Sequence, residues 1–389
     1  MELFTNSSFA YINNLDTNKF AKMLDDPTQC YKFYWLDAIL ALMITTDEDL
    51  SFDSIFDEMI CAAWHSVTKY HLRLGPVIQG VSVNLLELAV TIVGADSELP
   101  QPSSRRDILE AIKRNAPELR NIKEKLARNV PYRLLSPFMD DVGGNDRLWD
   151  QKRRLIAYID SINQKTVLLY TIIDGPGIKK KIHISTAWRR LIIDNYTVIR
   201  SWVQMKKVRF LQDRNPGVPG IVYKLGLDEE RNRKLNNARN LWKRFSDISG
   251  DSLSDIYTGE ALELSGFDLD HFVPWSYIAN DELWNLTPID GRINSIKSNK
   301  LPSWMPYFSR FADSQFNLYK SIFLNEELRN CFEKCRRDNL NAIWATEELY
   351  IEGNNEEKFK NILEHYLRPV YESARIQGYD VWKYVSADE

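Results

Sequence analysis

Apolar residues in the first third of the chain recur every three to four positions, which is the spacing of helices that bury one face. One run covers 33–43 and a second covers 55–64, where Asp53 or Ser54 is placed to cap the start of a helix. Residues 105–128 predict a further helix or a pair of helices. The N-terminal part of the chain is therefore expected to be helical.

A strand pattern replaces the helical pattern near residue 166. The apolar stretches 166–173 and 181–184 flank the turn residues 174–177, whose sequence Asp-Gly-Pro-Gly predicts a β-hairpin. Residues 186–210 are then predicted to form one long basic helix, and the other predicted helices cover 229–245, 326–336 and 358–377. The expected fold class is mostly α with small β parts.

Two features of the sequence restrict the class of protein. No apolar run is long enough to span a bilayer, and residues 1–5 lack the basic and apolar segments of a signal peptide, so a cytoplasmic location is expected. The cysteines form no CxxC pair and have no histidine at zinc-ligand spacing. We therefore expect Cys30, Cys61, Cys331 and Cys335 to be reduced and mostly buried thiols.

The charge is distributed unevenly along the chain. Residues 1–100 hold 14 acidic against 5 basic side chains, a balance of −9, whereas residues 179–244 hold 17 basic against 5 acidic ones, a balance of +12. Such an asymmetry is typical of a surface that meets phosphates, although solvated helix faces or pairing between the two regions would give the same count. The candidate phosphate contacts in the basic region are Lys206, Lys207 and Arg209.

The stretch 255–302 holds the residues that indicate chemistry. A short alternating run ends in Asp270-His271 and is stopped by Pro274, which predicts a strand. Residues 285–287 predict a second strand, and Asp290 can cap a following helix that carries Asn294. A strand, a loop, a strand and a helix would thus bring together a carboxylate, an imidazole and a carboxamide. Oxygen ligands suit Mg²⁺, and a neutral imidazole beside it can activate water as a general base.

These residues resemble the HNH (ββα-metal) endonuclease family, and most closely the HNH domain of Cas9 proteins. The resemblance covers about 50 residues, and the spacing from Asp270 to Pro302 matches without insertion. The chain lacks the length and the RuvC-like parts of a Cas9, so no RNA guide is expected. The matching positions are Tyr257-Thr258-Gly259, Asp270, His271, Pro274, Asn285, Asn294 and Pro302.

The resemblance implies a role for each matching polar residue. Asp270 and Asn294 would bind the metal. Asparagine as a ligand favours Mg²⁺ or Mn²⁺ as that metal. His271 would act as general base, and Asn285 would hold the loop around His271 in shape. The implied reaction is hydrolysis of a phosphodiester bond in DNA, with RNA not excluded.

Arg292, Lys297 and Lys300 are candidates to contact phosphates at this site, where such contacts would position the substrate without reading its sequence. One active centre cuts one strand, so a double-strand break would need a homodimer or a second encounter.

The expected organisation has four parts: a helical N-terminal domain (1–165), a hairpin and basic helical region (166–250), the HNH module (251–303) and a helical C-terminal region (304–389). Three functions stay open at this point. The chain is a self-sufficient endonuclease, an HNH-fold binding module without catalysis, or a partner-gated effector of a system such as prokaryotic antiviral defence. In the last case the acidic N-terminal region would sense a signal or dock a protein activator.

Overall fold

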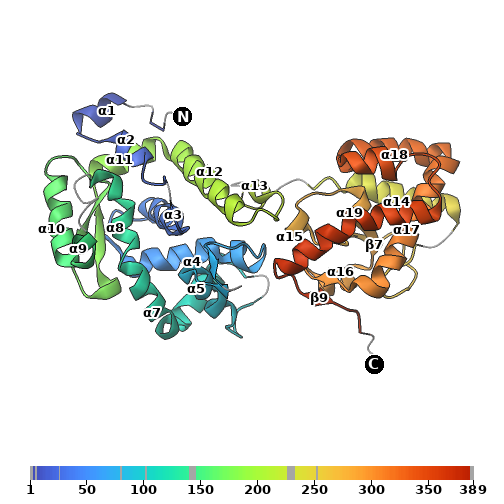
Figure 1. The fold of residues 1–389 in the computed structure, drawn as a ribbon, viewed down its shortest axis with the longest axis horizontal. Coiled ribbons are helices and arrows are strands. Elements are labelled where there is room, and N and C mark those ends of the chain that lie inside the picture. Colours follow the sequence, from blue (N-terminus) through green and yellow to red (C-terminus); the bar gives the residue numbers. More distant parts are fainter. Residues whose placement is uncertain are drawn as a thin grey trace. The chain divides into compact units, whose positions relative to one another are not determined.

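A computed structural model of the chain describes residues 3–4, 7–25, 27–78, 81–100, 103–139, 146–225, 233–250 and 253–385. Its residues fall into two compact units, drawn in Figure 1. Unit 1 comprises residues 1–216 with 225–227, and unit 2 comprises 217–224 with 228–389. Both units are mostly helical with small sheets, which confirms the expected fold class. None of the described helices is long and apolar enough to cross a membrane.

Unit 1 combines its helices with one three-stranded antiparallel sheet, of order β1-β5-β4, and it also holds the two-stranded β2–β3 ladder. The expected hairpin is present, with Ile172 opposite Ile182. The strands are β1 (Leu50–Ser51), β2 (Val77–Ile78), β3 (Val81–Ser82), β4 (Tyr170–Ile173) and β5 (Lys181–Ile184). The helices are α1 (Ser7–Ile12), α2 (Thr17–Ala21), α3 (Tyr31–Met43), α4 (Phe52–Thr68), α5 (Leu85–Gly94), α6 (Arg105–Arg114), α7 (Ala116–Ala127), α8 (Val130–Leu134), α9 (Asp146–Asp150), α10 (Lys152–Asn163), α11 (Thr186–Asp194) and α12 (Tyr196–Arg214).

Aromatic packing between α3 and α4 forms the core of unit 1. The ring of Trp35 lies 5.5 Å from that of Phe52 and 5.1 Å from that of Phe56, measured between centroids. The indole N–H of Trp35 donates to the hydroxyl of Tyr170 on β4 (3.2 Å), so the sheet is attached to the helical core. Buried aromatic groups of this kind contribute much of a core's stability when their polar atoms find partners.

Three predicted helices differ in their boundaries. The cap of α4 is Ser51 rather than Asp53 or Ser54, because the Ser51 hydroxyl accepts from the backbone N–H of Ser54 (3.0 Å). The expected single helix over 186–210 is two helices, α11 and α12, since the amide of Asn195 donates to the carbonyl of Leu191 (2.8 Å) and ends α11. The expected helix over 229–245 is found from Asn236 onward, and residues 229–232 lie outside the described part.

In unit 2 the long helix α17 contacts β7 of the two-stranded β6–β7 sheet, and it also contacts α18 and α19 (Figure 1). Its helices are α13 (Ile221–Lys224), α14 (Asn236–Ser249), α15 (Trp275–Ile278), α16 (Gly291–Lys297), α17 (Trp304–Leu324), α18 (Glu326–Asn339) and α19 (Glu356–Ile376). Its strands are β6 (Asp268–His271), β7 (Leu286–Ile289), β8 (Leu301–Pro302) and β9 (Val381–Trp382).

Two contacts anchor the segment that forms β6, β7 and β8. Phe272, the residue after β6, is fully buried and stacks on Phe311 of α17 with ring centroids 4.7 Å apart. In a separate small sheet, β8 pairs in parallel with β9, and the backbone N–H of Ser303 donates to the carbonyl of Trp382 (2.7 Å). The segment 255–303 is therefore held in place by residues that lie outside it.

A buried lysine joins α13 to α15. The ammonium of Lys224 donates to the carbonyls of Pro219 and Tyr277, the latter at 2.6 Å, and only 6% of the residue is exposed. Burial lowers the pKa of Lys224 to about 7. This contact ties the helix that follows Pro274 to the segment 217–224.

Candidate active site

Unit 2 contains the predicted strand–loop–strand–helix. Strand β6 runs antiparallel to β7, with Asp270 opposite Thr287. Helix α16 begins after Asp290, whose carboxylate accepts from the backbone N–H of Arg292 (2.8 Å) and of Ile293 (3.4 Å), as expected for this cap. Helix α16 contacts β6 and completes the ββα arrangement.

Helix α16 meets β6 through two side-chain pairs. Asp268 and Asp270 project from the same face of β6 because alternate residues of a strand share a face. Asn294 and Lys297 lie one turn apart on α16. The amide Nδ2 of Asn294 lies 3.4 Å from Asp268, and the ammonium of Lys297 lies 3.0 Å from Asp270. In this arrangement the two predicted metal ligands, Asp270 and Asn294, have different partners.

The carboxylate of Asp270 is buried, and each of its oxygens accepts a hydrogen bond. Lys297 is 0% exposed, and its ammonium donates to Asp270 and also to the backbone carbonyl of His271 (2.9 Å). The hydroxyl of Tyr257 donates to the other carboxylate oxygen (2.8 Å). Burial and the nearby charge of Asp270 raise the pKa of Tyr257 well above its usual value, so this hydroxyl keeps its proton. The Asp270–Lys297 pair is thus a buried ion pair in which Tyr257 is a second donor to the carboxylate.

The Tyr-Thr-Gly turn is attached to the start of α16 by Asp255. This buried carboxylate accepts from the backbone N–H of Tyr257 (2.8 Å) and of Thr258 (3.3 Å), and its other oxygen accepts from the backbone N–H of Asp290 (3.0 Å). Gly259 closes the turn at a φ of +82°, a backbone conformation that favours glycine. Asp255 therefore holds Tyr257 in place against Asp270.

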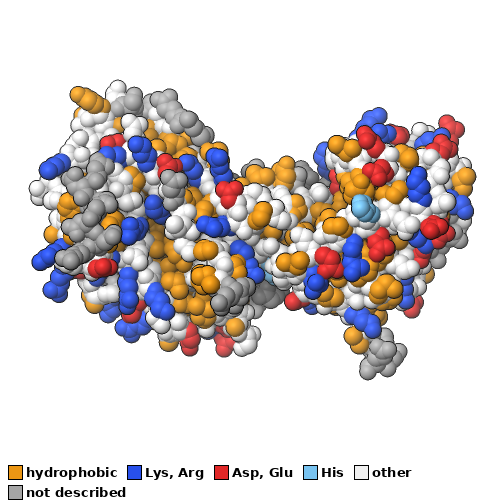
Figure 2. All heavy atoms as spheres, viewed as in Figure 1, with side chains coloured by type: hydrophobic (Ala, Val, Ile, Leu, Met, Phe, Trp, Pro, Cys, Tyr) orange, Lys and Arg blue, Asp and Glu red, His pale blue; other side chains and the backbone are white. Residues whose placement is uncertain are grey.

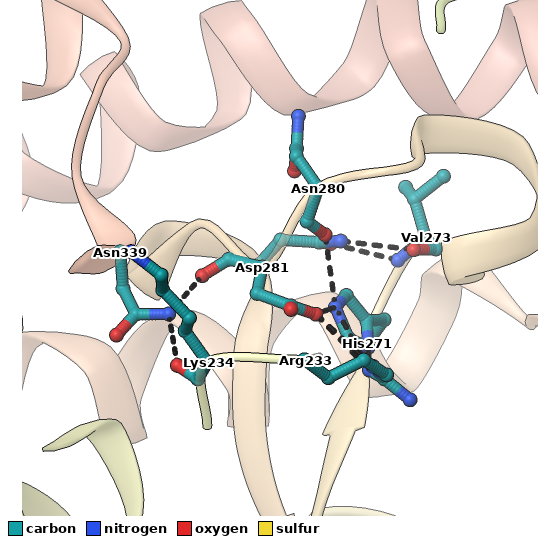
Figure 3. Close-up of polar contacts among 8 residues, drawn as sticks. Arg233, Lys234, His271, Val273, Asn280, Asp281 and Asn339 are labelled. Carbon is teal, nitrogen blue, oxygen red and sulfur yellow. Dashed lines mark hydrogen bonds and ion pairs between the residues drawn. The ribbon is translucent and has the colours of Figure 1, made fainter. Parts of the chain in front are cut away.

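His271 lies on the other face of β6 and is 4% exposed. Its Nε2 lies 3.1 Å from the carboxylate of Asp281 and 3.1 Å from the backbone carbonyl of Asn280 (Figure 3). Nη2 of Arg233 lies 3.1 Å from Nδ1 of the imidazole and 3.5 Å from its Nε2. Burial lowers the pKa of His271 below its usual value, although the hydrogen bond with Asp281 acts in the opposite direction. The imidazole is therefore neutral near pH 7.

Asn285 fixes the chain just after His271. It is 0% exposed, its carboxamide oxygen accepts from the backbone N–H of Val273 (2.8 Å), and its Nδ2 donates to the carbonyl of Val273 (2.9 Å). The carboxamide thus makes the two backbone hydrogen bonds with Val273 that a neighbouring strand would otherwise make. This geometry is compatible with the structural role that the resemblance implies for Asn285.

The six candidate phosphate contacts differ in exposure. Arg292 and Lys300 are exposed on the module, whereas Lys297 faces Asp270. In unit 1, Arg209 is exposed, but Lys206 pairs with Asp25 (2.7 Å) and the buried Lys207 pairs with Asp37 (2.8 Å). Pairing with the acidic N-terminal region is the alternative that the sequence left open for this basic stretch. On the visible face of unit 2, basic and acidic side chains are interspersed (Figure 2).

The donors at this site fit a cation that takes few protein ligands. Among the described residues, no group of three or more His, Cys, Asp or Glu side chains is placed to hold a metal ion. The face of β6 nevertheless offers the carboxylates of Asp268 and Asp270, with the carboxamide of Asn294 opposite Asp268. Asp268 has a half-exposed side chain, paired with Arg239 at 3.6 Å. Such oxygen donors suit Mg²⁺, which keeps several of its waters.

Sequence reasoning missed three residues of this site. Asp268 could have been found, since it precedes Asp270 by two positions and so shares its face of the strand. Asp281 lies in the loop between the strands, and Arg233 lies 38 positions before His271. Neither of these two has a periodic or motif signal in the sequence.

Residues 255–303 match the HNH endonuclease family. No curated protein and no solved structure was found to match the chain. HNH endonucleases act on nucleic acid and are generally metal-dependent, which agrees with the imidazole and oxygen donors described above. Over residues 255–303 the chain is therefore similar to HNH endonucleases.

Proposed function

We propose that the chain is a metal-dependent endonuclease that hydrolyses phosphodiester bonds in DNA. The observation that carries this proposal is the buried His271 at the end of β6, directly after Asp270 and on the same strand as the oxygen donor Asp268. A general base must be unprotonated near the working pH, and burial provides this for His271. The HNH match supports action on nucleic acid, and DNA is the specific substrate proposed.

His271 is assigned the role of general base. Its Nδ1 takes a proton from the water that attacks phosphorus in line with the leaving 3′ oxygen, so the products carry a 5′-phosphate and a 3′-hydroxyl. Mg²⁺ or Mn²⁺, held by Asp270 and Asn294 with Asp268 beside them, would offset negative charge on the phosphate and the leaving oxygen. Arg292 and Lys300 would hold the neighbouring phosphates.

A second candidate function, a partner-gated nuclease, is favoured by two contacts. Arg233 donates to the proposed base nitrogen of His271, and Lys297 pairs with Asp270, so both reactive groups are covered. A gated effector, for example in prokaryotic antiviral defence, would need an activator to release these contacts. The acidic N-terminal region is the proposed docking surface, although Asp25 and Asp37 are already paired within unit 1.

The test is incubation of the purified full chain with supercoiled plasmid in Mg²⁺, Mn²⁺ or EDTA. We expect cleavage with either metal, none in EDTA, and a loss of about 10²–10⁴ in rate for His271→Ala with DNA binding retained. His365→Ala, which replaces an exposed histidine of α19, is the matched control and should cut normally. Full activity in EDTA, or a wild-type rate for His271→Ala, would refute the mechanism. Tight DNA binding without cleavage under any condition would favour the gated or inactive alternatives.

A further inference from the structure

The loop between β6 and β7 returns over the imidazole of His271. Asp281, in this loop, places its carboxylate 3.1 Å from Nε2, next to the carbonyl of Asn280 at the same distance (Figure 3). On the other ring nitrogen, Nη2 of Arg233 lies 3.1 Å from Nδ1. Nε2 of the imidazole therefore faces two hydrogen-bond acceptors, and Nδ1 faces one donor.

These partners determine which ring nitrogen carries the proton of neutral His271. A carboxylate and a backbone carbonyl only accept hydrogen bonds, so both are satisfied when Nε2 carries the hydrogen. A guanidinium only donates, so Arg233 requires a lone pair on Nδ1. Both sides of the ring select the same tautomer, and the nitrogen left to take a proton is Nδ1.

Asp281 is itself held in a fixed, charged state. Burial alone would raise its pKa, but hydrogen bonds and charge from His271 and Arg233 hold the pKa below its usual value. Its side chain is 13% exposed, and its carboxylate also accepts from Nη2 of Arg233 (3.1 Å). Its backbone carbonyl accepts from Nδ2 of Asn339 at the end of α18 (2.8 Å).

The neighbouring residue strengthens this attachment. Glu282 is buried, and its carboxylate accepts from the backbone N–H of Asn341 (3.0 Å) and of Ala342 (3.3 Å). The position of Asp281 is thus set by residues that lie after the HNH segment in the sequence.

We propose that Asp281 is the positioning residue of His271. It keeps the hydrogen on Nε2 and so leaves the lone pair on Nδ1, which takes the proton of the attacking water once Arg233 gives up its contact there, and it stabilises the imidazolium that forms. This inference rests on the proposed function. In the reaction, the water oxygen bonds to phosphorus as its proton moves to Nδ1, and the bond to the 3′ oxygen breaks. The 3′ oxygen leaves with the electron pair and is protonated by solvent, while Asp281 stays ionised.

The first test does not depend on cleavage. Nitrogen-15 NMR of histidine-labelled full-length protein reports the tautomer of each of the five histidines, and His271→Ala identifies the resonances of His271. We expect a neutral imidazole with its hydrogen on Nε2, and an Nε2–H that exchanges with solvent faster in Asp281→Ala. Hydrogen on Nδ1 in the wild type, or unchanged exchange in the variant, would overturn the proposal even if the protein cuts DNA.

The second test measures single-turnover cleavage at saturating DNA. Asp281→Ala should lower the rate about 10–100-fold with an unchanged Kd for DNA, which is the usual effect of removing a group that orients a catalytic one. In a His271→Ala background the same change should have no further effect, since Asp281 acts through the imidazole. Equal losses in both backgrounds would show a merely structural role and refute the assignment.

Two variants serve as matched controls. Asp281→Asn should retain more activity than Asp281→Ala. Arg233 donates to the oxygen of the new amide, which keeps that oxygen in position to accept the hydrogen bond from Nε2 of His271. Asp338→Ala removes a carboxylate that pairs with Lys234 (3.3 Å) on the same side of unit 2, and it should cut at the wild-type rate. If the wild-type protein fails to cut, the proposed function fails while the NMR test still decides the role of Asp281.

Discussion

Replacing Asn285 with alanine should destabilise unit 2 and expose the chain that follows His271. The side chain is completely buried and satisfies both backbone groups of Val273, which is also buried. Truncation leaves one N–H and one C=O without a partner, and each such group costs about 1–3 kcal/mol. The expected loss of unfolding free energy is therefore about 2–6 kcal/mol. For a unit of this size, that lowers the midpoint of thermal unfolding by roughly 5–20 °C.

Calorimetry of the full chain measures this midpoint, and hydrogen exchange of the peptide that covers 271–285 locates the change. The matched control is Asn299→Ala, because Asn299 is exposed on the same module and should change the midpoint by less than about 2 °C. Faster exchange at Val273 together with slower cleavage is expected for Asn285→Ala. An unchanged midpoint with cleavage abolished would refute this reasoning, since Asn285 would then act in the chemistry and not as a support.

Three further outcomes follow from buried or exposed charges. Lys297→Met leaves the carboxylate of Asp270 buried with one donor, so it should cost about 3–5 kcal/mol without metal. Mg²⁺ or Mn²⁺ should restore more stability to this variant than it adds to the wild type, and equal effects would count against Asp270 as a ligand. Replacing Arg292 and Lys300 with glutamine should make the slope of log affinity against log salt shallower by roughly 0.9 per contact on B-DNA, and an unchanged slope would exclude them. Because the pKa of Lys224 is lowered to about 7, only the unfolded state stays protonated between pH 7 and its usual value, so stability should rise with pH there by at most about 1.4 kcal/mol per unit. Lys224→Met should flatten that rise in denaturation curves, and an identical pH dependence would contradict it.

The helices were predictable where local signals agree. Helix α18 begins after the cap Asn325 and has acidic residues in its first turn and basic ones in its last. The break at Asn195 was not visible, because the apolar spacing continues across it and α11 ends through the backbone and side-chain hydrogen bonds of Asn195. Charge counts were also a poor guide to surfaces, since Lys207 pairs with Asp37 from a distant segment.

The candidate site was predictable to the extent that it lies within one short motif. Asp270, His271, Asn285 and Asn294 occur at fixed spacing, so a local pattern indicates them together. The residues that contact them do not occur at a fixed spacing from the motif. Arg233 reaches His271 from a separate segment, and Asn339 reaches the loop of Asp281 from the end of α18. Contacts of this kind are set by tertiary packing, which leaves no trace in the spacing of residues.

The pairing of β8 with β9 has a consequence for biosynthesis. A nascent chain that has left the ribosome only as far as β8 already contains every residue of the HNH motif. It still lacks Trp382, whose ring contacts Tyr257 at 5.2 Å and thereby supports the hydroxyl that binds Asp270. Because β9 is translated about 80 residues after β8, this support arrives only after the whole motif has been made. The contact that supports Tyr257 against Asp270 is therefore completed by a segment synthesised after the motif itself.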